Sequence, residues 1–153
     1  MLDTNVFNRV IDGKILLPSF GDRWIVTGIQ RDELNNTKDD ARRIELLDKF
    51  DEVNPEVVFA SSFAFGIEGA GFGQAYWNDG SGNVEKMRAR LQELDRKCKT
   101  NRKDLNQERD ILIAETAIKN GATLVSDDCN LRQVVSEFGG CAIDSTKWTT
   151  SCP

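Results

Sequence analysis

Four acidic residues, spread over most of the chain, stand where the sequence predicts strand ends or helix starts. Asp3 ends a short apolar segment, and Glu33 lies just past a strand predicted over residues 24–27. Asp110 stands in the first turn of a helix predicted over residues 107–119, and Asp128 follows the next strand. Gathered carboxylates repel one another and lose solvation unless a cation compensates them. Mg²⁺ or Mn²⁺ is the natural partner, since both ions prefer oxygen ligands.

The chain contains no histidine. This excludes Ser-His-Asp and Cys-His mechanisms, together with any imidazole ligand to a metal. Chemistry would therefore rest on carboxylates, on lysine, or on a metal held by oxygen ligands. Because no C-x-x-C pair occurs, we interpret the cysteines as free thiols in a reducing, cytoplasmic compartment, with a disulfide fold as the weaker alternative. They are Cys98, Cys129, Cys141 and Cys152.

Each acid also has a purely structural interpretation. Asp3 could cap the helix that follows it, and either aspartate of residues 127–128 could cap a short helix expected from residue 131. Glu33 could be an exposed helix residue, beside the equally plausible Asp32. Asp110 could interact with the dipole of its own helix. For each acid taken singly, a structural role is the better explanation. The set of four acids is harder to explain by structural roles alone.

The elements that must position these acids alternate along the chain. Strands are predicted over residues 24–27, 56–60, 122–126 and 141–143, and residues 1–3 could end another. Helices are predicted over residues 5–11, 30–34, 38–50, 84–99, 107–119 and 131–138. This alternation predicts a three-layer α/β/α fold, Rossmann-like, with helices on both faces of a mostly parallel central sheet. Ligands of such folds bind at the carboxyl ends of the strands, where the acids would converge.

The size of the chain and its hydropathy favour one domain over residues 1–153. No apolar run approaches the ~20 residues that span a bilayer, and the first residues lack the pattern of a signal peptide. Helix 38–50 is expected to bury one apolar stripe. This stripe consists of Ala41, Ile44, Leu47 and Phe50.

Residues 61–83 are rich in glycine and aromatic residues and show no clear period. Two interpretations remain open for this segment. It could be a long loop whose aromatic rings are tucked into the core. It could also be a mobile element beside the active site, whose rings stack on unpaired bases.

Four motifs, in order along the chain, resemble those of PIN domains. Leu2-Asp3-Thr4-Asn5-Val6 resembles the opening motif, and Thr27 with Glu33-Leu34 resembles the second. The helix segment Asp110-Ile111-Leu112-Ile113-Ala114, followed by Thr116-Ala117, resembles the third. Leu124-Val125-Ser126-Asp127-Asp128 resembles the fourth, usually Leu-x-Thr-x-Asp. The resemblance covers about residues 1–34 and 106–143, and leaves an unmatched insertion over about residues 61–105.

The resemblance assigns roles to residues of this chain. Asp3, Glu33, Asp110 and Asp128 match the acids that bind metal and catalyse. The supporting polar residues are Asn5, Ser126 and Asp127, of which Ser126 stands where threonine is usual and Asp127 falls at a variable place of the motif. The family implies an endoribonuclease that cuts phosphodiester bonds with Mg²⁺ or Mn²⁺, in which Asp110 or Glu33 could position the attacking water.

Many PIN domains are VapC-like toxins of toxin–antitoxin pairs. By analogy, the partners expected here are an RNA substrate, a small antitoxin with a basic segment, and a second copy in a homodimer, with no membrane. Two other functions stay open. One is a PIN-like module that binds RNA or protein without cutting. The other, with a poorer fit, is an aspartyl phosphotransfer or receiver-like domain.

The net charge of −5 does not suggest a general nucleic-acid binder. Basic residues nevertheless crowd one segment, namely Lys86, Arg88, Arg90, Arg96, Lys97, Lys99, Arg102 and Lys103. A solvated helix face and a phosphate-contacting surface explain this segment about equally well. The candidates for RNA contact are Lys86, Arg90 and Lys97.

Overall fold

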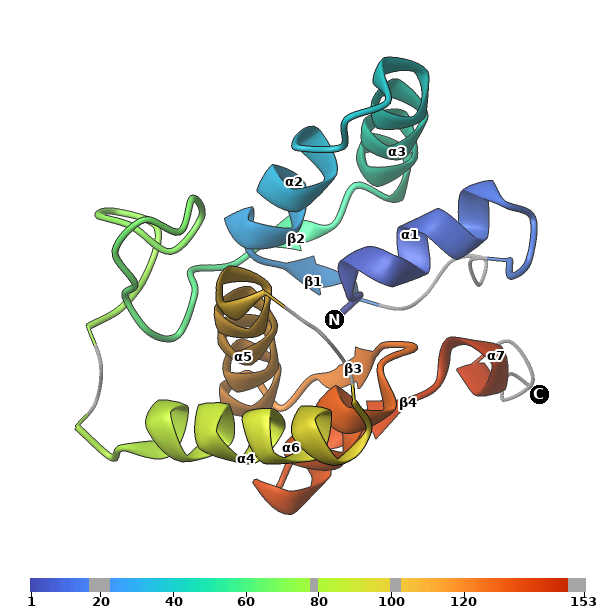
Figure 1. Cartoon of the computed structure of the whole chain (residues 1–153). Coiled ribbons are helices and arrows are strands. Elements are labelled where there is room, and N and C mark those ends of the chain that lie inside the picture. The colour runs from blue at the N-terminus through green and yellow to red at the C-terminus, as the bar shows by residue number, and fades with distance from the viewer. Residues whose placement is uncertain (17–22, 78–79, 100–102, 149–153) are drawn as a thin grey trace.

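A computed structural model describes residues 1–16, 23–77, 80–99 and 103–148 of the chain. The helices are α1 (Thr4–Ile11), α2 (Gly28–Asn35), α3 (Asp40–Val53), α4 (Asn83–Lys97), α5 (Asp104–Lys119), α6 (Cys129–Glu137) and α7 (Ser145–Trp148). The strands are β1 (Ile25–Val26), β2 (Glu56–Val57), β3 (Thr123–Val125) and β4 (Cys141–Ile143). Helices make up 54% of the described residues, whereas each of these strands has only two or three residues (Figure 1).

The predicted three-layer fold with a mostly parallel central sheet is wrong. Within the described ranges, β1 pairs with β2 and β3 pairs with β4, both in parallel, as two separate two-stranded sheets. The first residues lie beside β3 through a parallel bridge between Leu2 and Val125. Strands and helices alternate as expected, but these strands are too short to build a central sheet.

Helix caps explain why the extended segments end so early. Asp3, Thr27 and Asp128 are the N-cap residues of α1, α2 and α6. At α2 the cap is reciprocal, because Thr27 Oγ1 accepts from Ile29 N–H at 3.2 Å and Gln30 Oε1 accepts from Thr27 N–H at 2.8 Å. Each cap stabilises a helix start by about 1 kcal/mol. After β1 and β3, the chain therefore enters a helix within a few residues.

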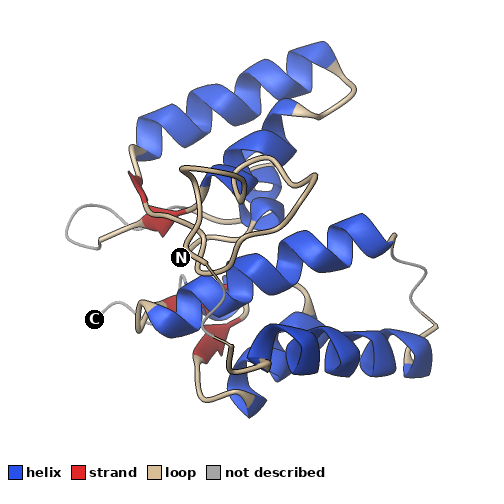
Figure 2. Ribbon diagram, turned by 90° about the vertical axis from the view of Figure 1, so that its left-hand side faces the viewer, coloured by secondary structure: helices blue, strands red, loops and turns tan. Residues whose placement is uncertain are grey.

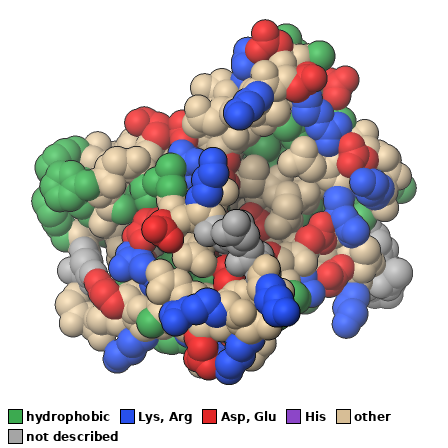
Figure 3. Space-filling model, in the orientation of Figure 1, with side chains coloured by type: hydrophobic (Ala, Val, Ile, Leu, Met, Phe, Trp, Pro, Cys, Tyr) green, Lys and Arg blue, Asp and Glu red, His purple; other side chains and the backbone are tan. Residues whose placement is uncertain are grey.

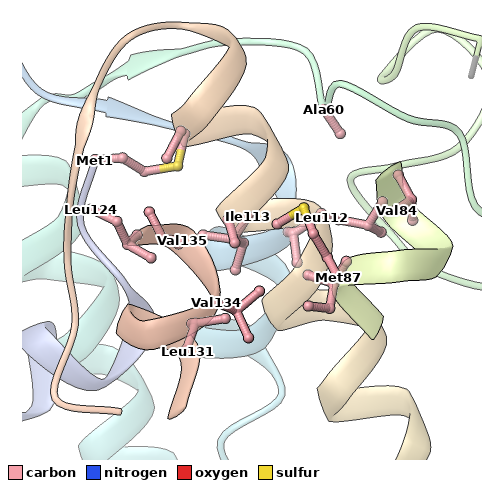
Figure 4. Packing of buried hydrophobic residues seen from close by; sticks show 14 of the residues in the cluster. Met1, Ala60, Val84, Met87, Leu112, Ile113, Leu124, Leu131, Val134 and Val135 are labelled. Carbon is pink, nitrogen blue, oxygen red and sulfur yellow. The ribbon is translucent and has the colours of Figure 1, made fainter. Parts of the chain in front are cut away.

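Two apolar clusters lie on opposite sides of the short strands. In β1, Ile25 belongs to the cluster with α4, α5 and α6, whereas Val26 belongs to the cluster with α1, α2 and α3. Leu124 and Val125 of β3 divide in the same way, as consecutive residues of an extended chain must. Figure 4 shows the first cluster, with Leu124 packed close to residues of α6.

The apolar stripe predicted for α3 is confirmed at Phe50 and at the partly buried Leu47, and wrong at Ala41 and Ile44. Ala41 and Ile44 are exposed, while Leu46 and Phe50 are buried. The buried face continues one turn earlier with Arg42, whose guanidinium donates to α1 at the carbonyl of Asn8, 3.0 Å away. The inward stripe thus has a charged residue at its start, and a search for apolar periodicity alone misses it.

The loop between β2 and α4 lies against α2 and against α5 (Figures 1 and 2). Its described part contains no helix, and Ala60 and Ala75 form an isolated parallel bridge within it. None of the described helices is long and apolar enough to cross a membrane. Cys98, Cys129 and Cys141 are free thiols, while Cys152 and the basic Arg102 lie outside the described residues.

Candidate active site

An open pocket of about 460 Å³ is lined by all four acids of the predicted site. Asp3 comes from the start of the chain, Glu33 from α2, Asp110 from α5 and Asp128 from the beginning of α6. Asn5 also lines the pocket. Acids that are far apart in the sequence therefore line the same pocket, which lies among α1, α2, α5 and α6.

The four acids do not form a ready-made metal centre. Within the described part of the chain, no group of three or more His, Cys, Asp or Glu side chains is placed to hold a metal ion. The carboxylate, amide and hydroxyl oxygens of the lining are nevertheless the donors that Mg²⁺ and Mn²⁺ prefer. The donor chemistry thus fits a hard cation, although such an ion would have to draw the carboxylates together.

Asp3 is the most deeply buried acid of the pocket, with 3% of its surface exposed. Its Oδ2 accepts hydrogen bonds from Ser126 Oγ at 2.5 Å and from Asn5 Nδ2 at 2.6 Å. Its Oδ1 accepts from the backbone N–H of Thr4 at 2.7 Å. Asn5 and Ser126, two of the three supporting residues suggested by the sequence, thus hold the carboxylate of Asp3 in place.

Burial raises the pKa of Asp3 to about 6. The nearby carboxylates of Glu33 and Asp128 raise it as well, while the hydrogen bonds from Ser126 and Thr4 lower it. Asp3 is therefore mostly ionised at neutral pH, but in a place where its charge is unfavourable. A cation bound in the pocket would relieve this unfavourable charge.

Two contacts place Glu33 beside the first residues of the chain. Gln30 Nε2, on the same helix, donates to the carbonyl of Leu2 at 3.2 Å. The hydroxyl of Thr4 donates to Glu33 Oε2 at 2.5 Å. The helix α2 is thus tied to the start of the chain one turn before Glu33, and Glu33 itself is held next to the cap of α1.

Glu33, and not Asp32, lines this pocket. Burial raises the pKa of Glu33, and the charge of Asp32 adds to this rise, while the Thr4 hydroxyl and the Arg109 guanidinium oppose it. Asp32 instead forms an ion pair with Arg109 at 2.7 Å, with 15% and 14% of these side chains exposed. Since Arg109 belongs to α5, the pair joins two helices that carry acids of the site.

Asp110 does not lie in the first turn of its helix as predicted. The helix α5 begins at Asp104, so Asp110 lies in the second turn. The dipole of a helix acts mainly within its first turn, and it does not account for an acid at this position. Asp110 is half-buried and lines the wall of the pocket next to Arg109.

Asp128 caps α6, as one interpretation of the sequence expected, and it also lines the pocket. Its Oδ1 caps α6 by accepting from the backbone N–H groups of Asn130 at 2.9 Å and Leu131 at 3.1 Å. Its own N–H donates to Ser126 Oγ at 3.1 Å. Ser126 thus connects Asp128 with Asp3, and the cap also presents a carboxylate to the pocket.

Asp127 is not part of the lining. Its carboxylate forms an ion pair with Arg9 of α1 at 2.8 Å and accepts a hydrogen bond from Ser145 of α7. Its backbone N–H donates to Asn5 Oδ1 at 3.2 Å. Asp127 therefore supports the site through its backbone, while its side chain joins α1 and α7.

The predicted RNA-contact residues lie on α4, outside the pocket lining. Arg90 pairs with Glu137 at 2.7 Å and with Glu93 at 2.7 Å, and Lys97 pairs with Glu93 at 2.6 Å. Lys86 is exposed. Two of the three basic residues are thus paired with acids, and such pairs are typical of a solvated helix face.

Several lining residues were missed at the level of sequence. Arg109 directly precedes Asp110, so the motif itself marks its position, and Thr4 stands inside the opening motif. The remaining polar residues have no motif that could have identified them. These are Asn8, Asn36, Thr37 and Asn106.

Comparisons of the chain with protein-family models, with curated proteins and with solved structures found no match.

Proposed function

We propose that this chain is a metal-dependent ribonuclease, which hydrolyses RNA phosphodiester bonds in the acidic pocket. The observation that carries the proposal is that Asp3, Glu33, Asp110 and Asp128, chosen by motif order in a chain without histidine, line one pocket. Asp3 and Glu33 combine burial with a raised pKa, which is typical of acids at functional sites.

The four acids would hold Mg²⁺ or Mn²⁺ in this pocket. A bound ion of this kind supplies Lewis-acid activation of the phosphodiester and of water, and stabilises the leaving oxygen. Ser126 and Asn5 keep the carboxylate of Asp3 oriented, and Thr4 does the same for Glu33. Asp110, on the wall formed by α5, would help to position the attacking water.

The choice of RNA rests on the resemblance of the four motifs to PIN domains. The same resemblance favours a VapC-like toxin in the cytoplasm, with a homodimer and a small antitoxin as its partners. An antitoxin segment that carries basic residues would be attracted to the acidic pocket. These partners depend on the family assignment, whereas metal binding depends only on the pocket.

A second candidate function is a PIN-like module that binds RNA or protein without cutting it. The specific observation in its favour is that the described acids are not gathered into a set that could hold a metal ion. The two candidates differ in one property, which is cleavage that requires both the metal and the acids.

The test is cleavage of single-stranded RNA with Mn²⁺ or Mg²⁺, compared with the same reaction in chelator. Asp128→Asn should lower the rate at least about 100-fold, and asparagine caps helices as well as aspartate does, so the fold should persist. The matched control is Asp48→Asn on the exposed surface of α3, which should cleave like the wild type. Equal cleavage by wild type and Asp128→Asn would contradict the proposed function.

A further inference from the structure

The loop between β2 and α4 carries a group of exposed aromatic rings. Phe65, Phe72 and Trp77 have 85%, 74% and 73% of their surface exposed. The half-buried Phe63 lies at the centre of the group, with its ring centroid 4.8 Å from that of Phe65, 4.9 Å from Phe72 and 5.2 Å from Trp77. Figure 3 shows hydrophobic side chains gathered at its left edge, on the side where this loop lies in Figure 1. We call Phe63, Phe65, Phe72 and Trp77 the aromatic surface.

The exposure of these rings bears on the first interpretation of residues 61–83, a loop whose rings are tucked into the core. Three of the four rings lie outside the core, so the interpretation that the rings are tucked into it is wrong for them. Exposed apolar patches of this kind are characteristic of binding surfaces, since solvent alone does not stabilise them.

The loop is fixed to the two helices that carry acids of the pocket. Gly69 packs directly on α2, where a Cβ on Gly69 would lie 2.2 Å from the backbone of Gly28. On the side of α5, the N–H of Ser61 donates to Thr116 Oγ1 at 2.9 Å, and Ser62 Oγ donates to Glu115 Oε1 at 3.0 Å. The aromatic surface and the acidic pocket therefore keep a defined relation to each other.

Arg109 connects the aromatic surface with the acidic pocket. It lines the acidic pocket and also a second pocket of about 340 Å³, whose other walls include Phe63, Phe65 and Phe72. Its Nε is buried and has no hydrogen-bond partner among the described residues. A guanidinium that lines both pockets places a positive charge between them, which favours a phosphate over an aliphatic ligand.

The composition of the surface favours nucleic-acid bases over an apolar protein segment. In the described part of this loop the exposed large hydrophobic residues are all aromatic, whereas exposed aliphatic residues such as Ile44 and Val57 lie on other elements. Aromatic rings form stacking platforms for bases, because every base presents a π-face. Aliphatic side chains would serve a protein partner equally well, and this surface does not use them.

We propose that the aromatic surface binds unpaired bases of single-stranded RNA by stacking and leads the strand past Arg109 to the acidic pocket. The inference rests on the proposed nuclease function for its choice of RNA. It adds the substrate class, a strand with accessible bases, and assigns substrate binding to the segment outside the family resemblance.

The test measures binding of a short, unstructured RNA in chelator, where no metal-dependent cleavage occurs. Phe72→Leu/Trp77→Leu keeps the apolar character and removes two rings, and should weaken binding about tenfold or more. Wild type should bind a strand of abasic sites as weakly as this variant binds the RNA. The matched control is Ile44→Ala on α3, which removes exposed apolar surface elsewhere and should bind RNA like the wild type.

Unchanged binding by the leucine variant, or equal binding of RNA and abasic strand by wild type, would overturn the proposal. A dimer that forms with concentration in sedimentation and is lost in the leucine variant would instead assign the surface to a second copy of the chain. Asp128→Asn separates this inference from the proposed function, since it should lose cleavage and keep base-dependent binding. Binding without any cleavage by wild type would refute only the nuclease.

Discussion

Arg109 borders both the acidic pocket and the aromatic surface, but the two regions are built by different means. In the pocket, Asp3 and Asp128 are helix caps, and hydrogen bonds fix their carboxylates. On the aromatic surface, ring contacts and glycine turns set the positions, with Gly66, Gly69 and Gly73 at positive φ. The pocket is therefore organised by helix caps that hydrogen bonds join across distant parts of the chain, and the aromatic surface by ring contacts within a single loop.

This difference predicts how each region responds to substitution. A change in the pocket should alter charge, metal affinity and pH dependence while the helices persist. A change at the base of the aromatic loop should alter the backbone of α2, because the two pack together without side chains between them.

The largest effect on stability is expected for Gly69→Ala. Gly69 has φ +86°, and an added Cβ would lie 2.2 Å from Gly28 C and 2.2 Å from Ile29 N, backbone atoms that cannot rotate away. We expect a loss of about 4 kcal/mol or more, with a melting temperature lower by roughly 10 °C. Thermal unfolding followed by circular dichroism measures both.

Gly73→Ala is the matched control, because Gly73 has φ +74° and no atom within 4 Å of an added Cβ. It should cost only about 1–2 kcal/mol from its backbone conformation. Equal losses for the two variants would show that the loop is not packed on α2 as described.

Asp3→Asn should change the pH dependence of folding. Because burial raises the pKa of Asp3 from 3.8 to about 6, the folded state binds this proton more tightly than the unfolded state. The free energy of unfolding should therefore fall as pH rises through this window, by about 3 kcal/mol. Asp3→Asn removes the titrating group and should flatten this fall.

Urea unfolding at several pH values between about 4 and 7, in chelator, gives the comparison. Asp48→Asn, an exposed acid of α3, should keep the slope of the wild type. A slope that persists unchanged in Asp3→Asn would mean that Asp3 is not buried as an unfavourable charge.

The smallest effect is expected for Lys97→Ala, one of the residues selected from sequence for RNA contact. Lys97 is exposed and pairs with Glu93, and such surface pairs contribute little to stability. Binding of RNA in chelator and the melting temperature should both stay close to those of the wild type. A large loss of RNA affinity would move the binding surface from the aromatic loop to α4.

The sequence allowed the acids to be located because caps and motifs follow local rules. Asp3 and Asp128 stand at predicted helix starts, and they cap helices in the structure. The hydrogen bond from Thr4 to Glu33 and the ion pair between Arg109 and Asp32 join separate elements, and no pattern within one element encodes them. The choice between Glu33 and Asp32 thus needed the structure.

The layered fold could not be predicted correctly for a related reason. Apolar runs such as residues 122–126 indicated full strands, but capping ends β3 at Val125, and β1 has only two residues. In α3, the inward Arg42 concealed the true stripe of Leu46 and Phe50. Pattern alone does not show how many extended residues pair, nor when a charged side chain turns inward.

The central claim, that the acidic pocket binds a divalent cation, is tested most directly by thermal unfolding with Mn²⁺. Binding to the folded state alone raises the melting temperature with ion concentration. We predict such a rise for wild type and Asp48→Asn, and none for Asp3→Asn. A wild-type melting curve that Mn²⁺ leaves unchanged, or an equal rise in Asp3→Asn, would contradict a metal site at Asp3.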